Sequence, residues 1–228
     1  MSIETHRVVI GACGWNHAAW LDEFYSEDLP EDWQLGFYSN EFSVVYVPAP
    51  DWVEHPDLEE WVDDVSESFR FILEVPARVL SDDAAYMEAL KNAKALNEFC
   101  LGFVFQVDTS ICKESALFQS RYKEASAIAS VCVDKQGCEC SGDFEQILLQ
   151  NNISELWNGT GSEIKGLGRG GLAITRIASD GLDMRSLRTV METCLSVSSD
   201  DCVSVLIIEG TPPSLEILRN ADTLLNLL

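Results

Sequence analysis

The chain of 228 residues is acidic and rich in apolar side chains: it has 38 Asp and Glu against 15 Lys and Arg, and 46% of its residues are hydrophobic. A formal net charge of −23 repels phosphate backbones and anionic bilayers, so we expect neither nucleic-acid nor membrane partners. No apolar stretch approaches the ~20 residues of a membrane span, and a single cytoplasmic domain over residues 1–228 is expected, with its eight cysteines reduced.

Apolar runs of strand length recur through the whole chain and are nearly continuous rather than alternating. This pattern is typical of strands buried on both faces, as in parallel sheets. The predicted strands are Val8–Cys13, Phe42–Val47, Phe69–Val75, Gly102–Val107, Ala127–Val133, Ile153–Trp157, Leu172–Ile177 and Val203–Glu209.

Segments with helical periodicity separate these runs. In the clearest of them, apolar residues such as Tyr86 and Leu90 follow a period near 3.6, and Ser81 and Asp82 are candidate caps. The predicted helices are Pro30–Asn40, Asp57–Ser66, Asp83–Phe99, Ser115–Lys123, Asp143–Gln150, Leu182–Leu195 and Ser214–Leu228.

The alternation of strands and helices predicts a parallel α/β sheet. Eight strands favour closure into a single (β/α)8 barrel of the TIM type over an open sheet. Only Asn158–Gly171 separates the sixth and seventh strands, and it is rich in glycine. We therefore expect the barrel to be irregular around its sixth β/α unit, where the helix is short or missing.

An ordered set of short motifs adds information that periodicity does not carry. The set comprises Ile10-Gly-Ala-Cys-Gly-Trp15, Trp20, Phe24-Tyr25, Leu29-Pro30, Phe37-Tyr38, Phe42-Ser-Val-Val-Tyr46, Phe69-Arg-Phe71, Val75-Pro76, Leu101-Gly102, Phe105-Gln106, Asn220-Ala221 and Leu224. Their order and approximate spacing over residues 8–107, and more faintly over 172–228, resemble the YecE-like family (domain of unknown function 72). The resemblance implies a fold similar to the barrels of sugar isomerases and apurinic endonucleases, and it implies no particular activity.

The chain departs from this family at the positions that would form a pocket. Tyr46 stands at the end of the second strand, where members have a Val-Glu-x-Asn sequence, and Glu74 replaces a lysine. Asp108 begins the segment that replaces a Pro-Pro pair, whereas Arg176 matches an arginine of the seventh strand. Scaffold residues thus match better than pocket residues, as in a divergent member.

Functional side chains of β/α barrels gather at the carboxyl ends of the strands. Glu74 and Glu209 are candidate catalytic residues as an acid–base pair, with a salt bridge to Arg176 as the alternative. His17, in the first loop, is a candidate proton shuttle, with a solvated loop histidine as the alternative. The predicted ligand-binding residues are Trp15, Gln106, Asp108, Asp134 and Arg176.

We expect neither a metal nor a cofactor. Of the three histidines, His6, His17 and His55, only His17 follows a strand end closely enough to reach a site at the carboxyl ends of the strands. A magnesium site remains an alternative, with Glu74, Asp108, Asp134 and Glu209 as its ligands. The densest thiol group is Cys132, Cys138 and Cys140, which has neither the spacing nor the fourth ligand of structural zinc.

Further alternatives concern single segments. Cys13 is a candidate nucleophile only with His17 beside it as base, and otherwise a small residue ending a strand. The Gly166–Gly171 segment precedes a strand, unlike a phosphate loop. It is a candidate flap with Arg169 as an anion contact, although tight turning explains its glycines equally well.

Two functions therefore stay open. The first is binding or transformation of a small polar metabolite, sugar-like or a carboxylate, at the strand ends. The second is a non-catalytic, degenerate barrel that binds a protein partner, with Trp52 and Trp61 as an exposed contact patch.

Overall fold

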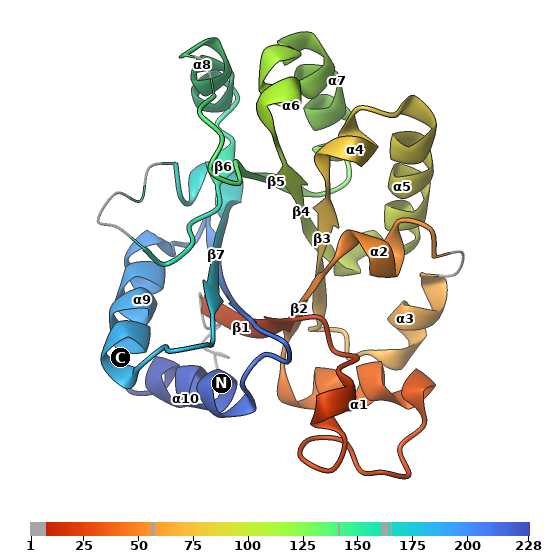
Figure 1. Cartoon of the computed structure of the whole chain (residues 1–228), viewed down its shortest axis with the longest axis vertical. Helices are drawn as coiled ribbons and strands as arrows, with labels where there is room; N and C mark the ends of the chain where they lie inside the picture. Colours follow the sequence, from red (N-terminus) through yellow and green to blue (C-terminus); the bar gives the residue numbers. More distant parts are fainter. Residues whose placement is uncertain (1–7, 56–57, 141, 161–163, 165) are drawn as a thin grey trace.

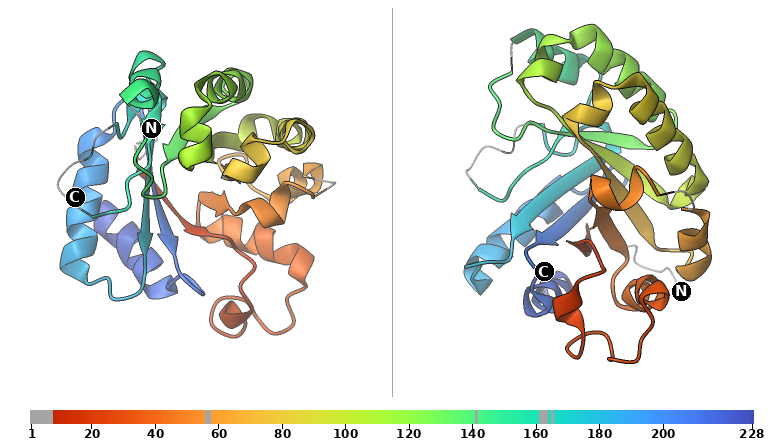
Figure 2. Two further views of the ribbon diagram at one scale, coloured as in Figure 1. Left: turned by 45° about the horizontal axis from the view of Figure 1, so that its top comes forward. Right: turned by 45° about the vertical axis from the view of Figure 1, so that its right-hand side comes forward.

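The computed structural model describes residues 8–55, 58–140, 142–160, 164 and 166–228. Eight parallel strands form one sheet that curves into a nearly closed barrel, with helices around its outside (Figures 1 and 2). The strands are β1 (Val8–Cys13), β2 (Val44–Val47), β3 (Arg70–Val75), β4 (Cys100–Gln106), β5 (Ser130–Asp134), β6 (Ser154–Glu155), β7 (Leu172–Ala178) and β8 (Val203–Glu209). Their order in the sheet is β6-β5-β4-β3-β2-β1-β8-β7, which confirms the predicted (β/α)8 fold.

The barrel has one seam, between β6 and β7. The backbone N–H of Trp157 donates to the carbonyl of Ile174 at 3.0 Å, and that of Arg176 donates to the carbonyl of Trp157 at 2.8 Å. A single parallel bridge therefore joins the two edges. Among the described residues between β6 and β7 there is no α-helix, only the 3₁₀ turn η4 (Arg169–Gly171). The predicted irregularity of the sixth unit is confirmed.

Helices of very different length cover the strands. They are α1 (Gln34–Glu41), α2 (Ala49–Trp52), α3 (Glu59–Asp64), α4 (Ala77–Leu80), α5 (Asp83–Ala95), α6 (Thr109–Lys113), α7 (Ser115–Ala125), α8 (Gly142–Gln150), α9 (Met184–Val197) and α10 (Leu215–Leu225), with 3₁₀ turns η1 (Ala18–Trp20), η2 (Glu31–Trp33) and η3 (Asn97–Phe99). None of the described helices combines the length and hydropathy needed to cross a bilayer.

The periodic segments predicted from sequence correspond to helices whose ends are shifted by a few residues. The first residue of the predicted Asp57–Ser66 helix lies outside the described residues, and α3 begins at Glu59. Asp82 caps α5 by accepting from the N–H of Ala85, whereas Ser81 does not cap it. The sequence prediction missed α2, α4 and α6 because one turn of helix is too short to show a period.

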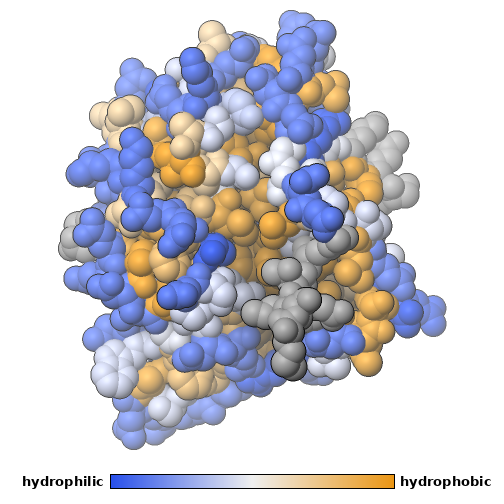
Figure 3. Space-filling view, turned by 180° about the vertical axis from the view of Figure 1, so that it is seen from behind, coloured by the Kyte–Doolittle hydropathy of each residue, from blue (hydrophilic) through white to orange (hydrophobic). Residues whose placement is uncertain are grey.

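Apolar side chains fill both the inside of the barrel and the space between strands and helices. The inside holds Val44, Tyr46, Ile72, Val104, Cys132, Leu172, Ile174, Val205 and Ile207. Neighbouring residues such as Phe71 and Leu73 face the helices instead, which explains why the strand sequences are continuously apolar. Seen from behind, the molecule is hydrophilic around its rim, and hydrophobic residues gather toward the centre of that face (Figure 3).

Candidate functional site

Five polar side chains converge above the barrel interior, each from a different strand. Arg176 of β7 is at the centre: its Nη2 donates to Oδ2 of Asp134 at 2.7 Å, and its Nε lies 3.2 Å from Oε2 of Glu209. Its Nη1 donates to the hydroxyl of Tyr46 at 2.9 Å. The Tyr46 hydroxyl in turn donates to Oε2 of Glu74 at 2.9 Å. We call this hydrogen-bonded group the strand-end network.

The two predicted catalytic carboxylates lie at the same end of the barrel but do not face each other. Tyr46 and Arg176 stand between them. The salt-bridge alternative describes Glu209, whereas Glu74 accepts from Tyr46 and, at 3.3 Å, from the N–H of Ala49. Burial and the neighbouring Glu74 raise the pKa of Tyr46, which keeps its hydroxyl protonated as a donor. The network is therefore a set of satisfied polar groups, and the acid–base role of the pair stays a prediction.

Two other predicted ligand-binding residues lie at the end of β4. Gln106 is half-buried there. Asp108 is exposed and caps α6, accepting from the N–H groups of Ser110 at 2.9 Å and Ile111 at 3.0 Å. The hydroxyl of Ser110 and these N–H groups lower the pKa of Asp108. Its position is thus explained by helix capping.

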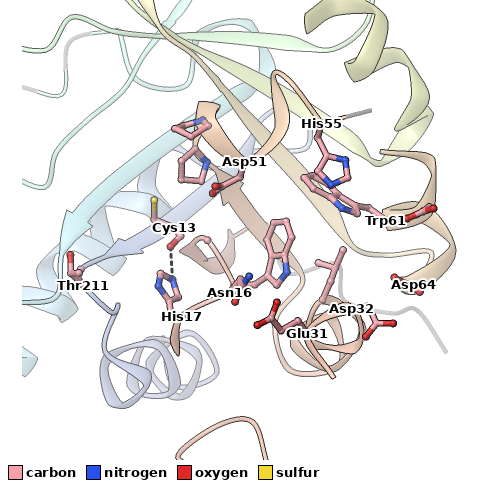
Figure 4. A pocket seen from close by; sticks show the side chains of 17 residues that line it. Cys13, Asn16, His17, Glu31, Asp32, Asp51, His55, Trp61, Asp64 and Thr211 are labelled. Carbon is pink, nitrogen blue, oxygen red and sulfur yellow. Dashed lines mark hydrogen bonds between the residues drawn. The ribbon is translucent and has the colours of Figure 1, made fainter. Parts of the chain in front are cut away.

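A cavity of about 750 Å³ opens at the carboxyl ends of β1, β2 and β8 (Figure 4). Its walls come from the loops that follow these strands and from η2, the start of α1 and α3. Its acidic lining residues are Glu31, Asp32, Asp51, Glu60 and Asp64, and its rings are Trp15, His17, His55 and Trp61. Cys13 also lines it, and its thiol lies within electrostatic reach of Arg176, Glu209 and Glu74. The cavity and the strand-end network therefore meet at Cys13.

His17 is the best-positioned basic group of the cavity. Gly14, with φ at +75°, turns the chain after β1 so that Nε2 of His17 lies 2.9 Å from the carbonyl oxygen of Cys13 (Figure 4). A carbonyl only accepts, so in the neutral ring Nε2 carries the proton and Nδ1 is the basic nitrogen. Burial lowers the pKa of His17, which favours this neutral form.

Asp51, in α2, supplies a carboxylate to the same cavity. Burial raises its pKa, and His17 acts in the opposite direction. Asp51 likewise raises the pKa of His17, although burial is the larger effect there. The two groups are therefore electrostatically coupled, with pKa values displaced toward each other by burial, as acid–base chemistry requires.

Two indole rings form an apolar wall. The centroids of Trp15 and Trp61 are 4.9 Å apart in an edge-to-face arrangement, and the ring of His55 lies 5.2 Å from Trp61. The carbonyl of Trp15 accepts from the hydroxyl of Tyr25 at 2.8 Å, which fixes the loop after β1. The wall is thus built from side chains that pack against one another.

The family-model comparison bears on what this barrel is. A model described as protein of unknown function DUF72 matches residues 9–120. The chain belongs to the DUF72 family. This confirms the resemblance drawn from the motifs, and the match covers the β1, β2 and α3 segments that line most of the cavity. No curated protein matches the sequence.

Solved structures extend the likeness to the whole chain. A DUF72 family protein from Thermotoga maritima is 12% identical, with a TM-score of 0.69, and the match covers 96% of this chain and 98% of that one. UMP synthase from Leishmania donovani is also 12% identical, with a TM-score of 0.54, over 97% of this chain and 52% of that one. At these identities the likeness concerns the fold alone.

The structure of the present chain corrects several sequence predictions. Trp52 and Trp61 are buried, so the exposed contact patch is wrong; both sit on helix faces that pack against the barrel. The indole N–H of Trp52 donates to the carbonyl of Glu74 at 2.9 Å, and Trp61 is a cavity wall. His55 also lines the cavity, so His17 is not the one well-placed histidine, and His6 lies outside the described residues.

The residues that sequence reasoning missed lie one or more residues beyond the strand ends. Asp51 and His55 follow β2 at a distance, and the acidic residues of η2 and α3 lie further still. No motif marks them. The available signal was compositional: the segments after the first two strands are unusually acidic for their length.

The metal and nucleophile alternatives also change. Asp134 and Glu209 bind Arg176, and no three of the four carboxylates proposed for magnesium come within ligand spacing among the described residues. Burial raises the pKa of Cys13 to about 12, so its thiol stays protonated and is a poor nucleophile. Arg169 pairs with Glu155 at 3.4 Å, and its role as an anion contact stays a prediction.

The expectation of eight free thiols is wrong for one pair. Cys112 and Cys140 form a disulfide, and Cys138 lies beside it. Cys132, which the sequence grouped with Cys138 and Cys140, points into the barrel instead. The sequence prediction erred because Cys112 is remote in sequence and reaches the group through the packing of neighbouring strands.

Proposed function

We propose that this DUF72 protein binds a small, uncharged polyhydroxyl metabolite of the sugar-like class in the cavity beside β1, β2 and β8. The observation that carries the proposal is the pairing of an aromatic wall with carboxylates in a cavity of about 750 Å³. That volume lies within the ~300–1000 Å³ usual for small-molecule sites. Its place at the carboxyl ends of the strands is where β/α barrels carry their sites.

The charge of the cavity selects between the sugar-like and the carboxylate ligand. Five carboxylates line it, and no Lys or Arg does among the described residues. An anionic ligand would meet repulsion with no compensating cation. Arg176, the strand-end cation, is already bound by Asp134 and Glu209. A ligand that donates hydroxyl hydrogen bonds to carboxylates and stacks on Trp15 or Trp61 is therefore favoured.

His17 and Asp51 give the cavity a means to transform what it binds. Neutral His17, whose Nδ1 carries no proton, is suited to accept a proton from the ligand. Asp51, with its raised pKa, is suited to donate a proton to it. Such a base and acid suit proton transfer between neighbouring carbons of a sugar-like compound. Glu74, Arg176 and Glu209 would act as positioning residues for the part of the cavity lining that Cys13 forms.

The binding step is tested by thermal unfolding in the presence of neutral hexoses, pentoses and polyols, compared with sugar phosphates and hydroxy acids. A saturating neutral ligand, at ~100 times its Kd, stabilises the native state by about 2.7 kcal/mol. For a chain of this size we expect a rise in Tm of roughly 5–10 °C. Anionic compounds should leave Tm unchanged.

The matched control uses a second tryptophan. Trp15→Ala should abolish the ligand-induced shift, whereas Trp33→Ala, at a residue that is 63% exposed and outside the cavity lining, should retain it. Stabilisation only by anionic compounds, or an undiminished shift in Trp15→Ala, would refute the proposal.

We further propose a cytoplasmic location without nucleic-acid or membrane partners. The net charge of −23 supports this, because it opposes contact with phosphate-rich surfaces. Absence of DNA binding even at low salt is the expected result. The contact patch expected for a protein partner does not support one, because Trp52 and Trp61 are buried.

A further inference from the structure

The loops after β4 and β5 bring three sulfur atoms together. Cys112 lies on α6, and Cys138 and Cys140 lie in the loop after β5. The Sγ atom of Cys138 is 3.5 Å from that of Cys112 and 3.2 Å from that of Cys140, and Cys112 and Cys140 are disulfide-bonded. All three sulfurs lie within 4.8 Å of one another. We call these three residues the thiol cluster.

Backbone hydrogen bonds hold two of the three cysteines in place. The N–H of Cys112 donates to the carbonyl of Asp108 at 3.0 Å in the first turn of α6. On the other side, Gln136 and Gly137 have φ of +47° and +74°, and the N–H of Cys138 closes this turn on the carbonyl of Lys135 at 2.8 Å. Cys112 and Cys138 are therefore each carried by a hydrogen-bonded element of the backbone, and Cys140 follows Cys138 by two residues in the same loop.

We infer that the thiol cluster, in its reduced form, is a binding site for one Zn²⁺ ion. A tetrahedral ion with Zn–S bonds of about 2.3 Å needs sulfurs about 3.8 Å apart. The separations of 3.5 and 3.2 Å from Cys138 lie near that value, and the sulfurs of Cys112 and Cys140 must move apart to it once their disulfide is opened. An iron–sulfur cubane is a poorer fit, because each cysteine binds a different iron and the sulfurs must lie further apart.

The surroundings suit a site with an exchangeable position. Cys112 is buried, while Cys138 and Cys140 are half-buried, which leaves a path for the ion. Three protein ligands leave the fourth tetrahedral position to water or to an added ligand, as in zinc sites that are not purely structural.

The cluster is separate from the cavity but connected to the strand-end network. None of its three cysteines lines the cavity. The turn that carries Cys138 is held by Asp134, whose Oδ1 accepts from the N–H of Gln136 at 2.9 Å while Oδ2 accepts from Arg176. The zinc inference therefore does not rest on the proposed metabolite, and either can fail alone.

Metal binding requires the disulfide to be opened first. A trialkylphosphine with one water converts the Cys112–Cys140 bond into two thiols and becomes the phosphine oxide, which balances the two electrons transferred. Zn²⁺ then displaces the thiol protons into solution.

The experiment titrates the reduced, chelator-treated full chain with Co²⁺ and then Zn²⁺ without oxygen. We expect one Co²⁺ per chain, with sulfur-to-cobalt charge-transfer absorption and tetrahedral visible bands, and displacement by one Zn²⁺. Cys138→Ser, which leaves both disulfide cysteines in place, should weaken Zn²⁺ binding by more than ~100-fold, because loss of even an outer-shell partner weakens it 10- to 100-fold. Cys112→Ser should do the same.

The matched control is Cys202→Ser, at a buried thiol outside the cluster, which should bind Zn²⁺ like the parent. Absence of thiolate-to-cobalt absorption in the reduced protein would overturn the inference. So would tight Zn²⁺ binding that survives Cys138→Ser and Cys112→Ser, since the ion would then lie elsewhere. Circular dichroism of each variant distinguishes loss of the site from loss of the fold.

Discussion

The strand-end network and the cavity lie at the same end of the barrel yet differ in how their charges are balanced. In the network, Arg176 contacts two carboxylates, and Glu74 accepts from a hydroxyl and a backbone N–H. In the cavity, five carboxylates face no lining Lys or Arg in the described part of the chain. The polar groups of the network are satisfied by one another, whereas the carboxylates of the cavity are available to a ligand.

The difference follows from where each region begins along the chain. The network side chains stand at or near the strand ends and point toward the barrel axis, where burial requires each polar group to find a partner. Side chains on the loops beyond are further from the axis and remain in reach of water. In this barrel, residues at the strand ends support the base of the cavity, and residues in the loops line the cavity itself.

The largest effect is expected when the network loses its cation. Arg176→Met leaves Asp134, which is only 8% exposed, and Glu209 without their partner. Breaking a buried ion pair from one side costs about 3–5 kcal/mol of unfolding free energy. Urea denaturation at neutral pH should show this loss, with a fall in Tm of at least ~6 °C.

The control for this change is an exposed ion pair. Arg188→Met removes the helical partner of Glu192, where both side chains are more than half exposed, and it should change the unfolding free energy by less than ~0.5 kcal/mol. Equal effects of Arg188→Met and Arg176→Met would mean that the network is not the closed support described above.

A smaller effect is expected from the hydroxyl that joins the two halves of the network. Tyr46→Phe removes the donor to Glu74 and the acceptor of Arg176 while keeping the ring inside the barrel. Leaving these groups unsatisfied should destabilise the protein by about 1–3 kcal/mol. Tyr122→Phe removes an exposed hydroxyl bond to Asn151 and should have almost no effect. Denaturation curves of the two variants give the comparison directly.

The fold was more predictable from the sequence than the site. Continuous apolar runs such as Val203–Glu209 identify strands buried on both faces, and the shortage of residues between Trp157 and Leu172 locates the irregular sixth unit. The network was partly predictable, because a strand end is a fixed place in a barrel. Asp51 and His55 were not, since the path of a loop depends on packing that no local pattern encodes. Cys112 joined two distant cysteines for the same reason.

The smallest effect separates the cavity from the network through pH. Burial lowers the pKa of His17 below its ordinary 6.5, so the unfolded chain binds a proton that the native state rejects. Its contribution to stability is complete above pH 6.5 and is lost as pH falls through the native pKa. The unfolding free energy of the wild type should therefore fall relative to that of His17→Gln on acidification below pH 6.5.

Asp51 should give the opposite slope. Burial raises its pKa above 3.8, so its contribution is complete below that pH and is lost as pH rises through the native pKa. The wild type should accordingly lose stability relative to Asp51→Asn as pH increases from 3.8. Urea titrations of the wild type and the two variants between pH 3.5 and 7.5 measure how each difference in unfolding free energy changes with pH. If both differences changed in the same direction, burial could not be disfavouring the charged forms of both His17 and Asp51. Opposite slopes, unchanged when Arg176 is replaced, would show that the loops and not the network control the titration of the cavity.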